Sequence, residues 1–245
     1  MKLMFFILRT NIFYRNRFLR FIPEYIAQIA GNGVNPSVFT LRELKQVLNS
    51  IYENHDGSLV GKPVILIRPC PCRDALRKYS KILPNITDII FTNNKKNYKQ
   101  NKDNKFITKD ELFKKLDFFD KRGLVHIVLG CMGVDGTGIN ICNCHKSVCF
   151  VLQAVLARGF LNGLKKGPSI AKVDPTKCKG IDECGECLSR CIFHARDILN
   201  NKGNIIEENC YGCGLCANSC PKKATIVVPR KNWKHSFFPV SLVRI

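Results

Sequence analysis

The stretch CYGCGLCANSCP, residues 210–221, constrains the fold of this chain more than any other feature. Cys210, Cys213, Cys216 and Cys220 follow the spacing C-x2-C-x2-C-x3-C, and a proline comes next. Three thiolates on so tight a loop can occupy three corners of an iron–sulfur cubane. The fourth cysteine starts a short helical turn, faces away from the first three and ligates the other cluster of a pair. The spacing therefore predicts a second, similar run of cysteines elsewhere in the chain.

The second run lies about thirty residues upstream, in CKGIDECGECLSRC, and contains Cys178, Cys184, Cys187 and Cys191. With this run, the lead-in SIAKVDPTKC and the closing KKATIVV, residues 168–229 resemble the bacterial-type dicluster ferredoxin domain. The resemblance implies two [4Fe-4S] clusters in a domain with pseudo-twofold symmetry. It assigns Cys178, Cys184, Cys187 and Cys220 to the first cluster, and Cys191, Cys210, Cys213 and Cys216 to the second. The alternative is a pair of four-thiolate zinc sites, which the spacing of either run alone would allow.

The first run departs from the pattern of that family in two places. Five residues separate Cys178 from Cys184 where the family usually has two, and Ile192 stands where proline normally follows the fourth cysteine. All four thiolates remain, so we expect the cluster to form. The longer loop should change amide contacts to sulfur and solvent access, which both influence the reduction potential.

Six further cysteines lie outside these runs, at positions 70, 72, 131, 142, 144 and 149. Two C-x-C pairs, Cys70 with Cys72 and Cys142 with Cys144, together supply four thiolates, enough for a structural zinc site or a third iron–sulfur cluster. Cys149 and His145 are alternative ligands, because Cys149 follows His145 by one helical turn. The other interpretations are buried free thiols, and a redox-active dithiol or catalytic cysteine.

The N-terminal half also resembles a known group of proteins. The segments RPCPCR, KRGLVHIV and INICNCH are similar to the C-x-C-R, GLVH and ICNC segments of larger ferredoxin-like proteins found in anaerobic archaea and bacteria. This likeness extends over roughly residues 63–229.

Composition and charge narrow the choice of binding partner and of cellular compartment. The 245 residues contain 14 cysteines, and the start of the chain shows no secretory signal, so we expect reduced thiolates in the cytoplasm. The apolar run before Arg9 is too short for a transmembrane helix. The formal charge is +20, and two clusters would leave about +16. That excess favours a redox partner with an acidic surface, although it also allows nucleic acid or peripheral contact with a membrane. Lysine and asparagine drift in a biased genome is the simpler explanation of stretches such as NNKKNYKQNKDNK.

The chain is expected to be α+β, with a mixed α/β cysteine-containing domain before the dicluster domain. We predict a basic amphipathic segment over 1–35, an α/β domain over 36–165, the ferredoxin domain over 168–229 and a tail over 230–245. TLRE at 40–43 and TKDE at 108–111 are capping boxes that predict helices, and a third helix is expected from 146 to about 160. Strands are expected at 63–69, at 87–92 and in LVHIVL, with a solvated loop at 93–105 and a glycine-rich turn in GVDGTG.

These observations predict an iron–sulfur electron-transfer protein, either a ferredoxin-like carrier or an electron-transfer subunit of an oxidoreductase. No nucleophile–base pair, flavin motif or nucleotide motif indicates an independent catalytic site. The alternative is a redox- or iron-sensing regulator with the same clusters, in which a winged-helix-like segment at 108–130 binds nucleic acid. A third possibility, an enzyme whose N-terminal centre acts on a substrate, would need an open iron coordination site.

Overall fold

The computed structural model describes residues 35–53, 64–81, 83–92, 95–98, 100–130 and 139–234, together with Lys2, Phe6 and Tyr25. The amphipathic segment expected near the N-terminus, the glycine-rich turn, Cys131 and the last eleven residues of the tail lie outside the described residues. The chain forms two compact units, and both are discontinuous in sequence. Unit 1 comprises residues 1–37, 55–112 and 127–165, and unit 2 comprises residues 38–54, 113–126 and 166–245. The expected domain boundaries stay a prediction.

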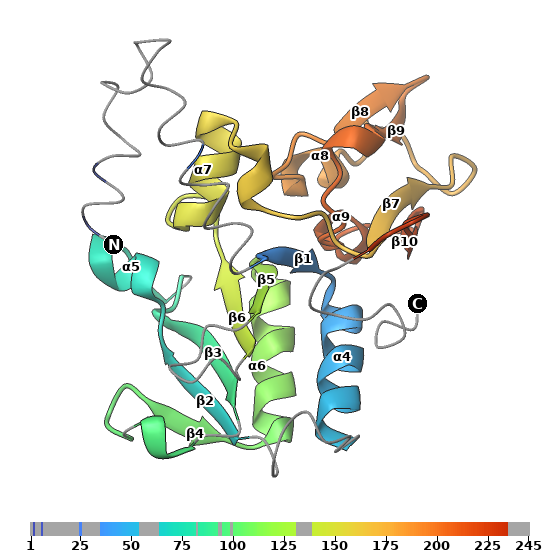
Figure 1. Cartoon of the computed structure of the whole chain (residues 1–245). Coiled ribbons are helices and arrows are strands. Elements are labelled where there is room, and N and C mark those ends of the chain that lie inside the picture. The colour runs from blue at the N-terminus through green and yellow to red at the C-terminus, as the bar shows by residue number, and fades with distance from the viewer. Residues whose placement is uncertain are drawn as a thin grey trace. The chain divides into compact units, whose positions relative to one another are not determined.

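The larger sheet has six strands in the order β1-β5-β6-β3-β2-β4. Strand β2 pairs antiparallel with both β3 and β4, and β3 pairs antiparallel with β6. Figure 1 shows β2, β3 and β4 side by side. The strands are β1 (Ser37–Phe39), β2 (Val64–Pro69), β3 (Ile86–Thr92), β4 (Lys105–Ile107), β5 (Val125–Gly130) and β6 (Ile139–Cys144).

All three strands expected from apolar runs are present, as β2, β3 and β5. Their central residues are buried, which is what a short apolar run predicts. The loop expected at 93–105 is partly wrong, because it contains a 3-10 turn, η1 (Lys95–Asn97), and the first residue of β4. Strand β5 lies between β1 and β6 in the sheet, and not in the two-stranded wing that a winged helix would need.

Both capping boxes form as predicted. Helix α4 (Leu41–Glu53) begins after Thr40, whose backbone N–H and hydroxyl donate to Glu43 Oε2, each at 2.8 Å. Helix α6 (Lys109–Lys121) begins the same way, with Thr108 N–H donating to Glu111 Oε2 at 2.8 Å. Gly123, with φ of 73°, follows the end of α6, where a left-handed residue is expected. Figure 1 shows α4 and α6 side by side, and Lys45 Nζ reaches Asp117 Oδ1 at 2.6 Å.

The two helices that lie wholly in unit 1 each follow a strand of the sheet. Helix α5 (Pro71–Leu76) follows β2, and α7 (Phe150–Arg158) follows β6 and a turn at 146–148. The expected start at 146 is therefore too early by four residues. A cysteine occupies the N-cap of each helix, Cys70 for α5 and Cys149 for α7, without a capping hydrogen bond from its side chain. A further 3-10 turn, η2 (Leu161–Gly163), follows α7.

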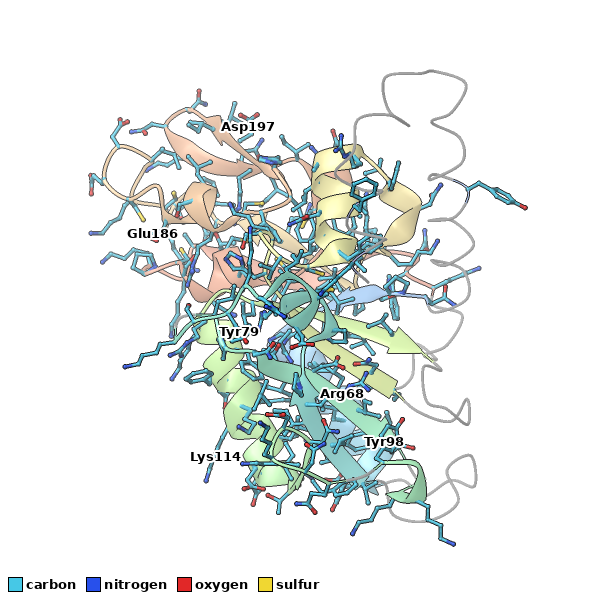
Figure 2. All side chains as sticks on the ribbon, turned by 90° about the vertical axis from the view of Figure 1, so that its left-hand side faces the viewer. Arg68, Tyr79, Tyr98, Lys114, Glu186 and Asp197 are labelled. Carbon is cyan, nitrogen blue, oxygen red and sulfur yellow. The ribbon has the colours of Figure 1, made fainter. Side chains whose placement is uncertain are left out.

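Within unit 2, the segment after residue 166 consists of short elements that repeat in order. Strand β7 (Ser169–Val173) pairs antiparallel with β10 (Thr225–Pro229), and β8 (Arg196–Leu199) pairs antiparallel with β9 (Lys202–Ile205). The short helices are α8 (Glu186–Arg190) and α9 (Leu215–Asn218), with a 3-10 turn, η3 (Glu207–Asn209), before the second cysteine run. Glu186 at the start of α8 and Asp197 on β8 are exposed (Figure 2).

Helices α4 and α6 provide polar anchors for this segment inside unit 2. Ser169 Oγ donates to the buried carboxylate of Glu43, and Asn218 Nδ2 donates to Asp120 Oδ2 at 2.7 Å. After β10, at the C-terminal end of this segment, Arg230 donates to the carbonyls of Gly167, Ser169 and Cys210, the last at 2.7 Å. The ferredoxin-like segment is thus tied by one buried and one partly buried hydrogen bond to helices that come from the first half of the sequence.

Candidate functional site

The cysteines of the two C-terminal runs line two separate hollows in unit 2. The first hollow has a volume of about 400 Å³, part of it open to solvent, and its lining includes Cys178, Cys184, Cys187 and Cys220. The second has a volume of about 350 Å³, and its lining includes Cys191, Cys210, Cys213 and Cys216. Each hollow therefore takes three cysteines from one run and the fourth from the other.

A glycine and a short helix position the cysteines in the same way in both runs. Gly185 and Gly214 are the N-caps of α8 and α9, with φ of 66° and 77°. In each run a cysteine comes directly before this glycine and another lies in the first turn of the helix. The left-handed backbone favours glycine. A Cβ on Gly214 would also lie only 3.1 Å from Thr40 Cγ2.

Backbone amides point at the sulfurs that each run contributes to the other hollow. Ala195 N–H donates to Cys191 Sγ at 3.3 Å, and Thr225 N–H donates to Cys220 Sγ at 3.5 Å. Although burial opposes the shift, the amides of Thr225, Ala224 and Lys222 lower the pKa of Cys220. Burial raises the pKa of Cys187, Cys213 and Cys216. Deprotonating these thiols therefore needs a compensating cation, which metal binding supplies.

Arg196 lies beside cysteines of both hollows. Its charge acts on Cys187 of the first hollow and on Cys216 of the second. Its Nη2 donates to Thr225 Oγ1 at 3.0 Å and its guanidinium also hydrogen-bonds Cys216, whereas Nε is buried without a hydrogen-bond partner in the described part of the chain. Buried N–H groups and positive charge between two sets of thiols fit a pair of anionic clusters. The chemistry of this lining, four sulfurs with amide donors and a cation, is that of an iron–sulfur site.

The structure also brings together five cysteines of unit 1. Cys142 and Cys144 share one face of β6, Cys70 and Cys72 lie at the start of α5, and Cys149 caps α7. The sulfurs of Cys144 and Cys149 are 3.2 Å apart. Cys72 is within hydrogen-bonding reach of Cys70 and Cys149, and its sulfur accepts the N–H of Phe150 at 3.5 Å.

Cys142 differs from the other four because its sulfur also faces oxygen. It donates to the buried carboxylate of Asp88, with Sγ and Oδ1 3.3 Å apart, and it approaches Asn140 Oδ1 at 3.9 Å. Asp88 is paired with Arg68 of β2 at 2.6 Å (Figure 2 labels Arg68). The thiol of Cys144 donates to Cys142, but burial and Asp88 outweigh this and raise the pKa of Cys142 to about 11. The pKa of Cys149 is shifted the other way, because the neighbouring thiols of Cys144 and Cys72 lower it.

Arg73, the residue after the second cysteine of the first C-x-C pair, is 0 % exposed and acts on this group of thiols. Its guanidinium donates to Pro84 O, to Thr87 Oγ1 at 2.8 Å and to Asn143 O at 2.9 Å. Its Nε is buried without a partner among the described residues. These three acceptors are neutral, so the positive charge of Arg73 is buried in the described region without a carboxylate bonded to it. The C-x-C-R motif is the only sequence signal that could have identified this residue as part of the site.

The histidines do not join either group of cysteines in the described structure. His145 Nδ1 contacts Ser147 Oγ at 2.7 Å. His126 is buried with Nε2 3.6 Å from Asp120 Oδ1, and His194 is exposed. The thirteen described cysteines are all free of disulfide bonds. Over the same described residues, no three His, Cys, Asp or Glu side chains are gathered as they would be around a bound metal ion.

Comparison with known proteins identifies the class to which this site belongs. Residues 204–224 match the 4Fe-4S binding domain family. The chain is 31% identical over 100 residues to Ferredoxin-3 from Nostoc sp., a match that spans 33% of this chain and all of that protein. It is 34% identical over 58 residues to an uncharacterized ferredoxin from Methanocaldococcus jannaschii, spanning 23% of this chain and 92% of that protein. No solved structure matches the chain.

The chain therefore belongs to the ferredoxin family and is an iron–sulfur electron-transfer protein with a 4Fe-4S binding domain. Two thirds or more of the chain lies outside the segment that matches each of these relatives. No helix in the described part of the chain is long and apolar enough to span a membrane.

Proposed function

We propose that the two hollows of unit 2 each hold one [4Fe-4S] cluster. Cys178, Cys184, Cys187 and Cys220 would bind the first, and Cys191, Cys210, Cys213 and Cys216 the second. The observation that carries the proposal is the division of the cysteines, three from one run and one from the other in each hollow. The repeated glycine caps of α8 and α9 support the expected pseudo-twofold relation of the two halves.

The clusters supply reversible one-electron chemistry, and the residues around them set its energy. The amides of Ala195 and Thr225 donate to sulfur and thereby stabilise its negative charge. Arg196 places a positive charge beside both hollows. Apolar residues, including Ile170, Ala171 and Ala195, pack with Cys210 and Cys216 and limit the access of water to the second site.

This arrangement favours a carrier that receives an electron at one site and passes it on from the other. We propose a ferredoxin-like carrier or an electron-transfer subunit of an oxidoreductase, with a separate redox protein as partner. The charge of +20 favours a partner with an acidic surface. Neither the family match nor the relatives favour the nucleic-acid-binding regulator.

The test is the iron and acid-labile sulfide content of two serine variants of the full chain, purified without oxygen. Cys187→Ser and Cys216→Ser should each lose about 4 iron and 4 sulfide relative to the parent protein, because each removes one ligand of one cubane. The double variant should lose about 8 of each. Cys142→Ser, which changes a cysteine outside both hollows, should keep these 8 irons and serves as the matched control.

Two results would contradict the proposal. One is a parent protein with fewer than about 6 irons after careful reconstitution. The other is loss of about 8 irons from either single variant while circular dichroism shows that the protein remains folded, because the two sites would then not be separate.

A further inference from the structure

The five cysteines of unit 1 form a connected group of sulfurs. The connections run from Cys70 to Cys72, from Cys72 to Cys149, from Cys149 to Cys144 and from Cys144 to Cys142. These residues come from three places in the sequence, namely the end of β2, strand β6 and the start of α7. A fold that brings so many thiols together from distant segments is typical of a metal centre, whereas isolated buried cysteines act as small apolar residues.

A contact with a carboxylate distinguishes Cys142 from the other four cysteines. Cys142 donates its S–H to the buried carboxylate of Asp88, with Sγ and Oδ1 3.3 Å apart, so an oxygen already engages this sulfur. The sulfur of Cys149, in contrast, lies 3.2 Å from that of Cys144 and within reach of the thiol of Cys72, and it accepts a backbone N–H from Leu152. Cys70 and Cys72 accept the N–H groups of Arg73 and Phe150. Amide donors to sulfur stabilise thiolate ligands, so the favoured set includes Cys149 in place of Cys142.

The charge of Arg73 is an independent reason to expect anions here. A fully buried guanidinium is costly unless a negative charge accompanies it, and the acceptors of Arg73 in the described structure are neutral oxygens. The ionisable groups on which it acts are Cys70 and His145. Four thiolates around a divalent ion or a four-iron cluster carry a net charge of roughly −2, which would more than offset the single positive charge of this arginine.

We propose that Cys70, Cys72, Cys144 and Cys149 form a third centre, a four-thiolate site for a thiophilic metal, beyond the clusters of the proposed function. The side chains must turn from each other toward a common point when metal binds. This requirement does not count against the site, because the cysteines of the 4Fe-4S binding domain do not meet at one point in the described structure either. Cys72 is only partly buried, so the site has a route for metal entry.

The experiment compares two single-cysteine variants from the same sulfur group in the full chain. Iron, zinc and acid-labile sulfide are measured per chain in the parent protein, Cys149→Ser and Cys142→Ser, all purified without oxygen. The parent should contain either one zinc or about 4 irons with 4 sulfides in addition to the clusters of unit 2. The variants Cys187→Ser and Cys216→Ser, measured in parallel, remove the clusters of unit 2 and so show how much metal belongs to them. Cys149→Ser should lose this additional metal and keep the other irons, whereas Cys142→Ser should keep both.

Either metal supports the four-thiolate centre, and the measurement distinguishes the ion from the cluster. A parent protein with no metal beyond the clusters of unit 2 would overturn the proposal. Loss of the metal from Cys142→Ser but not from Cys149→Ser would overturn the ligand set. If Cys149→Ser does not fold, alkylation of the parent followed by peptide mass spectrometry replaces it. Cys70, Cys72, Cys144 and Cys149 should react only after chelation, and equal reactivity before and after chelation overturns the site.

Discussion

At the scale of single residues, two arginines place positive charge beside the sulfurs of this chain. Arg196 lies beside both hollows of unit 2, and Arg73 lies beside the thiols of unit 1. Both have buried nitrogen atoms without a hydrogen-bond partner in the described structure. Because a guanidinium stays protonated at any pH that the protein tolerates, each is a permanent cation next to groups that gain negative charge on metal binding or reduction.

Arg196 should raise the reduction potentials of the two clusters that we propose for unit 2. A reduced cluster carries one more negative charge than the oxidised one, so a nearby cation stabilises the reduced form. Arg196→Gln is therefore expected to lower both potentials by on the order of 50–100 mV, measured by potentiometric titration with electron paramagnetic resonance. Lys177→Gln is the control, because Lys177 is an exposed cation already paired with Asp174. Unchanged potentials in Arg196→Gln, or an equal shift in the control, would contradict this role.

At the scale of secondary structure, the capping box of α4 has a second purpose. Glu43 accepts hydrogen bonds from Thr40, as TLRE predicts, but it is 2 % exposed and also accepts the hydroxyl of Ser169 from β7. One carboxylate thus caps the N-terminus of α4 and also holds the first strand of the ferredoxin-like segment. Burial, the largest influence, raises its pKa above the ordinary value of 4.5, although the hydrogen bonds from Ser169 and Thr40 oppose this.

The sign of the resulting pH dependence follows from that direction. A carboxyl with a higher pKa in the folded protein binds its proton more tightly there than when unfolded. Its contribution to the free energy of unfolding is complete below pH 4.5 and is lost as the pH rises through the folded pKa. The parent protein should therefore become less stable relative to Glu43→Gln as the pH rises between about 5 and 8.

Midpoints of anaerobic thermal unfolding at several pH values check this expectation. Glu43→Ala, which leaves the donors of Thr40 and Ser169 without their acceptor, should be destabilised by about 2–3 kcal/mol at every pH. Glu43→Gln retains an acceptor and serves as the isosteric control. If the parent became more stable relative to Glu43→Gln with rising pH, the carboxyl would have a lowered pKa in the fold.

At the scale of the whole molecule, the excess of positive charge should govern encounters with redox partners. With 39 Lys and Arg against 19 Asp and Glu, the charge remains at about +16 after two clusters are included. Electron transfer from the reduced protein to a negatively charged acceptor such as ferricyanide should slow about tenfold between low and high ionic strength, as salt screens the attraction. The rate with a cationic hexaammine acceptor should rise under the same conditions. Stopped-flow absorbance measures both rates, and equal salt dependence for the two acceptors would exclude electrostatic steering.

The sequence by itself determined the features that depend on local spacing. The cysteine runs around Cys184 and Cys213 predicted iron–sulfur ligation, because three thiols within ten residues or fewer can reach one cubane without help from the rest of the fold. The capping boxes at Thr40 and Thr108 and the apolar runs of β2, β3 and β5 were predictable for the same reason, since hydrogen bonds and burial there repeat over a few residues.

Only the tertiary structure decided which distant residues meet. The sequence predicted the two C-x-C pairs of unit 1 as one group and left Cys149 as an alternative. Cys142 contacts Asp88 on the neighbouring strand β3, whereas the sulfur of Cys149 lies 3.2 Å from that of Cys144. The contact of Ser169 with Glu43 joins residues 126 positions apart, and Arg196 acts on cysteines of both runs. Such contacts arise from the packing of whole strands and helices, so no local pattern in the chain specifies them.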